Sequence, residues 1–209
     1  GHSFPTRRSS DLVKNKTPKY GNDDDYADGI MKTIFNAYFN VINGRKNGRG
    51  GFHKIEMLPT TCHVYFGDVL GASSDGRKSH MPVSEGISPA QGADTQGPTA
   101  VIKTCAKMDH IKTGGTLLNQ KFTPSIVAGE AGLNNMASLV RTYFKMDGHH
   151  IQFNVVEKKT LLAAQKDPDN YNDLIVRVAG YSDYFNNLDR ALQDEIINRT
   201  EQTFEGSAC

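Results

Sequence analysis

The chain has 209 residues, of which 37% are hydrophobic, so it can form one domain or a large part of one. Its formal net charge is +1, which excludes the strong basic field expected of a protein that binds nucleic acid or an anionic membrane surface. No apolar stretch is long enough to cross a bilayer. The three cysteines (Cys62, Cys105 and Cys209) are odd in number and far apart, which argues against a disulfide framework. These features predict a cytoplasmic protein with no nucleic-acid or membrane partner.

The first residues do not resemble a natural start. The chain begins with Gly1, and its first methionine is Met31. Residues 4–12 resemble the conceptual translation of a sequencing adapter, so we exclude residues 1–12 from the fold prediction as an artefact. A flexible basic terminus is the alternative. The artefact hypothesis predicts that the natural protein continues upstream of Val13.

Helix and strand patterns alternate in the first half of the chain. Residues 22–42 carry apolar residues at helical spacing, and Asn22 or Asp23 is placed to cap this helix. Residues 54–66 alternate and end in β-forming residues, which predicts a strand. Residues 71–98 are rich in Gly, Ser, Pro and Asp, which predicts a long loop of a kind that is usually functional or a linker.

The second half continues this mixture. Ile151, Phe153 and Val155 alternate with polar residues, which predicts a strand whose apolar face is buried. The other predicted elements are helices over residues 98–108, 133–146, 160–165 and 187–200, and strands over residues 117–122 and 174–179. This order of strands and helices predicts an α/β fold.

A single glycine, Gly180, stands where the apolar run 174–179 ends and an aromatic-rich segment begins. One reading is conformational, because a turn needs a positive φ that glycine adopts freely. The other is chemical: loss of a hydrogen atom from a glycine Cα leaves a planar radical, which a Cβ would crowd. Apolar and aromatic neighbours would keep solvent and oxidants away from such a radical. The pattern by itself leaves both readings open, and it predicts that a helix follows the turn immediately.

The segment around Gly180 runs Arg177, Val178, Ala179, Gly180, Tyr181, and it resembles the glycyl radical signature of the pyruvate formate-lyase superfamily. Further blocks resemble the same family in the same order: residues 81–89 (MPVSEGISP), 97–100 (GPTA), 119–122 (NQKF) and 150–155 (HIQFNV). The resemblance extends over about residues 17–204, and the ordered set makes it far more specific than any single block.

The resemblance implies a radical mechanism in two stages. Gly180 would store the radical, and Arg177, Val178, Ala179 and Tyr181 would support its loop. The chain itself would bind no cofactor. An activating enzyme that uses S-adenosylmethionine and an iron–sulfur cluster would be the partner that installs the radical. The radical would then pass to a cysteine that attacks a small-molecule substrate.

The resemblance also implies a place for the chain in a larger fold. The family builds a ten-stranded α/β barrel around the catalytic cysteine, with the glycyl radical loop followed by a terminal helix. Residues 13–80 would end the barrel domain, and residues 81–209 would form the glycine radical domain. Cys62 and Cys105 do not match the motif of the catalytic loop, so the working cysteine is expected upstream. The chain alone is therefore expected to be inactive, and the full-length protein to be a homodimer.

Several blocks, over residues 20–28, 57–67, 107–111 and 146–152, resemble the branch of the family that dehydrates trans-4-hydroxy-L-proline to 1-pyrroline-5-carboxylate. Glycerol or diol dehydratases, choline trimethylamine-lyases and formate C-acetyltransferases share many of these blocks and stay open as alternatives. Thr60 and Thr61, which the resemblance places at the start of a barrel strand, are candidates for hydrogen-bonding the substrate, and simple β-propensity also accounts for them. No metal site is predicted, because adjacent histidines on a strand (His149 and His150) point to opposite faces.

Two functions of other classes also stay open. One is a small stand-alone glycyl radical protein that restores an oxygen-cleaved partner, which predicts a resemblance confined to the last part of the chain. The other is an α/β binding domain in which Gly180 is only a turn residue. A resemblance that begins near residue 17 and the adapter-like start favour part of a longer carbon–oxygen lyase over the stand-alone protein. A glycine-centred radical signal would decide against the binding domain.

Overall fold

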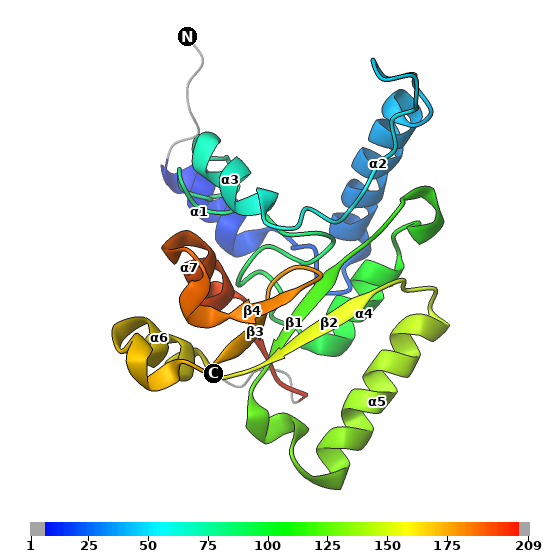
Figure 1. Ribbon diagram of the computed structural model, residues 1–209. Coiled ribbons are helices and arrows are strands. Elements are labelled where there is room, and N and C mark those ends of the chain that lie inside the picture. The colour runs from blue at the N-terminus through cyan, green and yellow to red at the C-terminus, as the bar shows by residue number, and fades with distance from the viewer. Residues whose placement is uncertain (1–6, 205–209) are drawn as a thin grey trace.

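Two small sheets form the centre of the protein. The computed structural model describes residues 7–204, with side chains from residue 11 onward. The larger sheet has three parallel strands, with β1 (Leu118–Phe122) between β2 (Ile151–Val155) and β5 (Glu201–Gln202). The smaller sheet is an antiparallel hairpin of β3 (Ile175–Arg177) and β4 (Ser182–Tyr184). Figure 1 shows helices around both sheets, which confirms the predicted mixed α/β class.

Helices surround the sheets in the described part of the chain. Helix α2 rises away from the body of the protein, and α5 forms the crossover from β1 to β2 that parallel strands require (Figure 1). None of the helices within residues 7–204 is both long and apolar enough to span a membrane. The α-helices are α1 (Arg7–Lys16), α2 (Asp25–Ile42), α3 (Cys62–Val69), α4 (Pro98–Ala106), α5 (Gly129–Lys145), α6 (Lys158–Lys166) and α7 (Arg190–Asn198).

Helix α2 is capped by Asp24 and not by the predicted Asn22 or Asp23. The Asp24 carboxylate accepts hydrogen bonds from the backbone N–H groups of Tyr26 and Ala27. Asn22 instead accepts from two N–H groups of the loop before α4, and Asp23 forms ion pairs with two lysines of the α4 region. Tertiary contacts of Asn22 and Asp23 therefore leave Asp24 as the residue that caps the helix.

Strand β1 separates two apolar clusters. All five of its residues are buried, and successive side chains point to opposite faces of the sheet. The first cluster joins α6, α7 and the hairpin, and consists of Leu117, Val156, Leu161, Ala164, Val176, Val178, Ala179, Phe185, Leu188, Leu192, Ile196 and Ile197. The second joins α2, α4 and α5, and consists of Phe35, Met57, Ile87, Val101, Ile102, Cys105, Met108, Leu118, Phe122, Leu139 and Tyr143.

The strand predicted over residues 151–155 is confirmed as β2, but its more buried face is the polar one. Gln152 and Asn154 are only 6% and 5% exposed, whereas Val155 is 45% exposed. Ile151 and Phe153 are partly buried against the second cluster. The polar face is buried because it lies against the backbone of the hairpin, whose N–H and C=O groups need partners.

The strand predicted over residues 54–66 is wrong. Residues 54–61 join neither sheet, and helix α3 begins at Cys62. Tyr65 and Phe66, whose aromatic rings suggested a strand, are 64% and 50% exposed. Gly67 lies on the buried face of α3, where a Cβ would collide with the backbone of residues 81–82. This close contact with a later loop is a tertiary feature that β-propensity does not reveal.

The other predictions differ mainly at boundaries. The long loop predicted over residues 71–98 is confirmed, because no helix or strand forms between the end of α3 and Pro98. Helix α5 begins at Gly129 and not at Leu133. The helix predicted over residues 187–200 is confirmed as α7, but the predicted aromatic turn before it contains strand β4 and a 3-10 turn. Residues 1–6 and 205–209 lie outside the described residues, and residues 7–12 lie in α1.

Candidate functional site

Gly180 lies at the tip of the β3–β4 hairpin. Arg177 is the last residue of β3, and the Val178 N–H donates to the Tyr181 carbonyl oxygen at 2.9 Å. Ala179 and Gly180 are therefore the two central residues of the turn. Val178 and Ala179 are buried in the first apolar cluster, whereas Gly180 is exposed.

The backbone of Gly180 requires a glycine. Its φ of 81° lies in the left-handed region that favours glycine. A Cβ at this position would meet only Leu117 Cδ1, at 3.8 Å, which is an ordinary van der Waals contact. Glycine is therefore required by the backbone conformation and not by a lack of room for a side chain. The conformational reading of Gly180 holds, and it is compatible with the radical reading, because both need a residue without a Cβ.

Two side-chain amides of β2 hold the hairpin on its sheet side. The Gln152 Oε1 atom accepts from the Gly180 N–H at 3.1 Å and from Arg177 Nε at 2.8 Å. Asn154 binds the backbone of Arg177 twice, donating to its carbonyl and accepting from its N–H, both at 2.7 Å. These bonds satisfy backbone groups that would otherwise be buried without partners, and they fix the hairpin relative to the sheet.

Three side chains converge on the carbonyl oxygen of Val178. Asn119 and Gln152, which are opposite each other in the parallel register, donate to it at 3.2 and 3.4 Å. Arg199, which follows α7, donates from Nη2 at 3.0 Å and from Nη1 to the Arg177 carbonyl at 3.2 Å. The peptide group that leads into the turn is thus held from both the sheet and the last helix.

A buried ion pair positions Arg199. Its guanidinium contacts both carboxylate oxygens of Glu195, with a shortest distance of 2.8 Å, and the two side chains are 7% and 0% exposed. Burial would raise the pKa of Glu195, but the charge of Arg199, helped by His63 at 3.6 Å, lowers this pKa to about 2. Glu195 is therefore ionised at neutral pH and serves as a fixed partner for the guanidinium.

A second buried acid, Glu85, is linked through Ser88 to Asn119, which binds the Val178 carbonyl. The Ser88 hydroxyl donates to the Glu85 carboxylate and accepts from the Asn119 N–H at 2.9 Å. Burial raises the pKa of Glu85 to about 7, against the opposing charge of Arg199. Glu85, Ser88, Asn119, Glu195 and Arg199 border one cavity of ≈ 20 Å³, which has room for about one water molecule.

The aromatic residues of the hairpin do not cover Gly180. Tyr181 and Tyr184 are 38% and 47% exposed, and Phe185 is fully buried in the first cluster. Within residues 7–204 the hairpin aromatics leave Gly180 exposed, and shielding of the glycine stays a prediction for the longer protein. Burial at the turn comes from Val178 and Ala179, on one side only.

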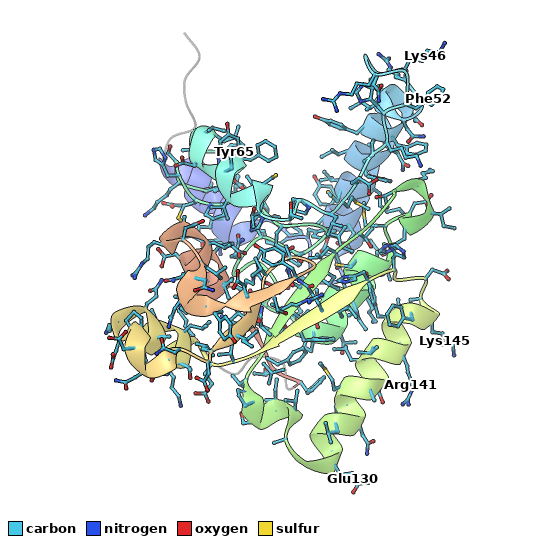
Figure 2. All side chains as sticks on the ribbon, viewed as in Figure 1. Lys46, Phe52, Tyr65, Glu130, Arg141 and Lys145 are labelled. Atoms are coloured by element: carbon cyan, nitrogen blue, oxygen red, sulfur yellow. The ribbon has the colours of Figure 1, made fainter. Side chains whose placement is uncertain are left out.

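An open groove of ≈ 650 Å³ lies between α3 and α7, and both Thr61 and Tyr181 line it. Tyr65, which Figure 2 labels on α3, lines it as well. Thr60 does not: it is exposed, has a φ of 54°, and donates its hydroxyl to the Pro59 carbonyl at 2.6 Å. Both threonines directly precede helix α3, in a region where a strand was predicted. Of the two candidate residues, the structure brings only Thr61 to the groove that Tyr181 borders.

The described cysteines are on α3 and α4 and not on the hairpin. Cys62 is exposed, whereas Cys105 is fully buried, and burial raises the pKa of its thiol. The Cys105 Sγ contacts the Tyr20 hydroxyl at 3.6 Å and the Ile87 carbonyl at 3.3 Å. Within residues 7–204, no three or more His, Cys, Asp or Glu side chains are grouped so that they could hold a metal ion.

The sequence predicted the turn but not the residues that hold it, namely Asn119, Gln152, Asn154 and Arg199. The sequence did contain an indication for Gln152 and Asn154 of β2, because amides that alternate with apolar residues in a core strand need a buried partner. Arg199 gave no such signal, since a pair with Glu195 at i,i+4 is also typical of an exposed helix face.

Two protein-family models match the chain. The model described as glycine radical matches residues 83–186, which include the hairpin and Gly180. The model described as pyruvate formate lyase-like matches residues 9–67.

Known relatives agree with both matches. The chain is 72% identical to trans-4-hydroxy-L-proline dehydratase of Clostridioides difficile over 193 residues, which are 92% of this chain and 24% of the relative. It is 42% identical to (2S)-3-sulfopropanediol dehydratase of Klebsiella oxytoca, over 91% of this chain and 24% of the relative.

Solved structures agree as well. The fold matches hydroxyproline dehydratase from Clostridioides difficile with bound trans-4-hydroxy-L-proline, with a TM-score of 0.90 and 70% identity over 94% of this chain and 25% of that one. It also matches the glycerol-bound B12-independent glycerol dehydratase from Clostridium butyricum, with a TM-score of 0.89 and 47% identity over the same shares of the two chains. The chain thus spans about a quarter of the length of these relatives. It belongs to the glycyl radical enzymes of the pyruvate formate-lyase superfamily.

Proposed function

We propose that this chain is the radical-storing part of a longer glycyl radical dehydratase, and that Gly180 stores the radical. The observation that carries the proposal is that the glycine radical model covers Gly180, which lies at a hairpin tip whose backbone is bound by buried side chains. These hydrogen bonds keep the tip in a defined place. We propose that the partner that installs the radical is an activating enzyme with S-adenosylmethionine and an iron–sulfur cluster.

Activation breaks one Cα–H bond of Gly180 homolytically. The hydrogen atom leaves with the abstracting radical that the activating enzyme supplies, and the unpaired electron stays on Cα. The net charge of the hairpin does not change, so the buried ion pair behind it needs no new partner. The bonds from Gln152 and Asn154 hold the turn while Cα changes from tetrahedral to planar. Val178 and Ala179 exclude water on the core side.

The substrate reaction takes place in the longer protein. We propose that the radical passes from Gly180 to a cysteine upstream of this chain, on a loop inside a ten-stranded barrel. Residues 13–80 would end the barrel domain and residues 81–209 would form the glycine radical domain. The complete burial of Cys105 supports a packing role for that thiol. The full-length enzyme would be a cytoplasmic homodimer.

For the substrate we propose trans-4-hydroxy-L-proline, because identity falls from 72% for the hydroxyproline relative to 42% for the sulfopropanediol relative. The cysteine radical would take a hydrogen atom beside the hydroxyl-bearing carbon. A neighbouring acid would protonate the departing hydroxyl group, the ring N–H would give a proton back to this acid, and the thiol would then return its hydrogen atom. The products are 1-pyrroline-5-carboxylate and water. Thr61 is the stronger candidate of the two threonines for a substrate contact, because it lines the groove.

The test is electron paramagnetic resonance of the longer protein after anaerobic activation. We expect a doublet, because one hydrogen remains on the radical Cα. Gly180→Ala should abolish the doublet, whereas Gly129→Ala should keep it. Gly129 is a matched control, since its φ of 69° is also positive and nothing lies within 4 Å of an added Cβ. No doublet in the wild-type protein, or a doublet that persists in Gly180→Ala, would overturn the proposal.

Two further measurements test the substrate. The activated enzyme should release water from trans-4-hydroxy-L-proline and leave glycerol, propane-1,2-diol and choline unchanged. Turnover of one of these three and not of hydroxyproline would assign the enzyme to another branch. The upstream DNA should encode a Cys-x-Glu loop, whereas adjacent cysteines there would indicate a formate-lyase.

A further inference from the structure

We propose that Gln152 is a positioning residue that tunes the radical on Gly180. Its Oε1 atom holds the Gly180 N–H at 3.1 Å, and thereby sets how much of the unpaired spin the amide nitrogen carries. The proposal rests on the proposed function, because it needs the radical on Gly180. It adds a residue that acts on the radical without touching the reacting carbon.

The contacts of Gln152 determine which end of its amide faces Gly180. Two donors face its oxygen: the Gly180 N–H and Arg177 Nε. Two acceptors face its nitrogen: Asn119 Oδ1 and the Val178 carbonyl. A flipped amide would set donor against donor and acceptor against acceptor at all four contacts. The oxygen therefore faces the glycine.

The same contacts keep this oxygen in place. Gln152 is 6% exposed, so water competes little for the bond from the sheet side, and the low local dielectric strengthens it. Arg177 Nε binds the oxygen at 2.8 Å from the strand that leads into the turn. The acceptor and the glycine are thus tied to the same hairpin and keep their relative position.

This hydrogen bond acts one covalent bond away from the reacting carbon. In a glycyl radical, the unpaired electron on Cα is shared with the lone pair of the amide nitrogen. An acceptor on the N–H raises the electron density at nitrogen, so more spin moves from Cα to nitrogen. The hydrogen that remains on Cα reports the spin density there through the splitting of the doublet. A stronger acceptor at position 152 should therefore narrow the splitting, and loss of the acceptor should widen it.

The experiment measures the doublet in the full-length protein for Gln152→Met and Gln152→Glu. Methionine has a similar size and no amide, so it loses all four hydrogen bonds, including the acceptor on the Gly180 N–H. We expect a wider splitting and at least about fivefold less radical per chain, which is the effect of one such bond alone. Glutamate keeps an oxygen facing the N–H and adds negative charge, so we expect a narrower splitting than in the wild type.

Asn154 supplies the matched controls, Asn154→Leu and Asn154→Asp. It lies on the same sheet face, is 5% exposed and binds only the backbone of Arg177 in the hairpin. These variants loosen the hairpin similarly but leave the acceptor on Gly180, so their splitting should equal that of the wild type.

The outcomes separate this inference from the proposed function. No doublet in the wild-type protein overturns both. A wild-type doublet with the same splitting in Gln152→Glu, or with equal changes in the Asn154 variants, overturns the role of Gln152 alone. If Gln152→Met does not fold, the doublet splitting of Gln152→Glu still tests the role of Gln152. A loosened hairpin alone does not predict a narrower splitting in that variant.

Discussion

Removal of the Arg199 charge should loosen the last helix and the hairpin together. In the variant Arg199→Met, Glu195 keeps its buried carboxylate but loses the guanidinium that binds both of its oxygens. The pKa of Glu195 is about 2 in the folded protein, well below its ordinary value, because the charges of Arg199 and His63 outweigh the effect of burial. Removing one partner of a buried ion pair costs about 3–5 kcal/mol.

Hydrogen exchange in the full-length protein, read by mass spectrometry, measures this effect without global unfolding. For helix α7, about 3 kcal/mol corresponds to exchange roughly a hundredfold faster at neutral pH. The hairpin segment 174–185 should also exchange faster, because the carbonyls of Arg177 and Val178 lose their charged donor. The sign of the pH dependence follows from the depressed pKa. The pair stabilises the protein above about pH 4.5, and this contribution is lost as the pH falls toward 2.

Two further variants separate the ion pair from its hydrogen bonds. The double variant Glu195→Leu with Arg199→Met removes both charges, so α7 should recover most of its protection while the hairpin stays loosened. Arg190→Met is the control, because Arg190 pairs with Asp194 at 3.5 Å on the same helix but is 67% exposed, and exchange should change less than about fivefold. The reasoning is refuted if Arg199→Met speeds exchange in α7 no more than Arg190→Met does, or if the double variant exchanges as fast as Arg199→Met.

The other predictions concern the support of the hairpin, the packing of α3 and the stored radical. Because burial raises the pKa of Glu85 to about 7, the folded protein keeps a proton that the unfolded chain releases above about pH 4.5, so stability should fall between pH 4.5 and 7. Glu85→Gln should flatten this fall in the thermal midpoint, and an unchanged slope would exclude Glu85 as its source. Gly67→Ala would push a Cβ into the backbone of residues 81–82, so exchange in α3 should increase at least tenfold, whereas Gly71→Ala, with nothing within 4 Å of its Cβ, should not change it. Air should cleave the activated chain at Gly180, and an intact mass after exposure of a protein that showed the doublet would contradict the radical assignment.

Local patterns determined several elements of this protein without help from the fold. Pro98 marked the first residue of α4, and helical spacing marked α2 and α5, because these signals depend on residues within one or two turns. Gly180 was identified as the residue of a turn with positive φ for the same reason. The family resemblance came from ordered blocks of sequence, which no single periodicity supplies.

Tertiary contacts decided what the local patterns left ambiguous or predicted wrongly. The segment before Gly67 has the composition of a strand, but it forms helix α3, whose Gly67 packs closely against residues 81–82. In β2 the alternation was visible, but only the hairpin backbone explains why Gln152 and Asn154 are the buried side chains. The acceptor on the Gly180 N–H lies 28 residues away in sequence, and the guanidinium on the Val178 carbonyl lies 21 residues away. Hydrogen bonds at such separations depend on how sheet and helix meet, so the sequence by itself pointed to Gly180 as the candidate for the radical and the tertiary structure determined what surrounds it.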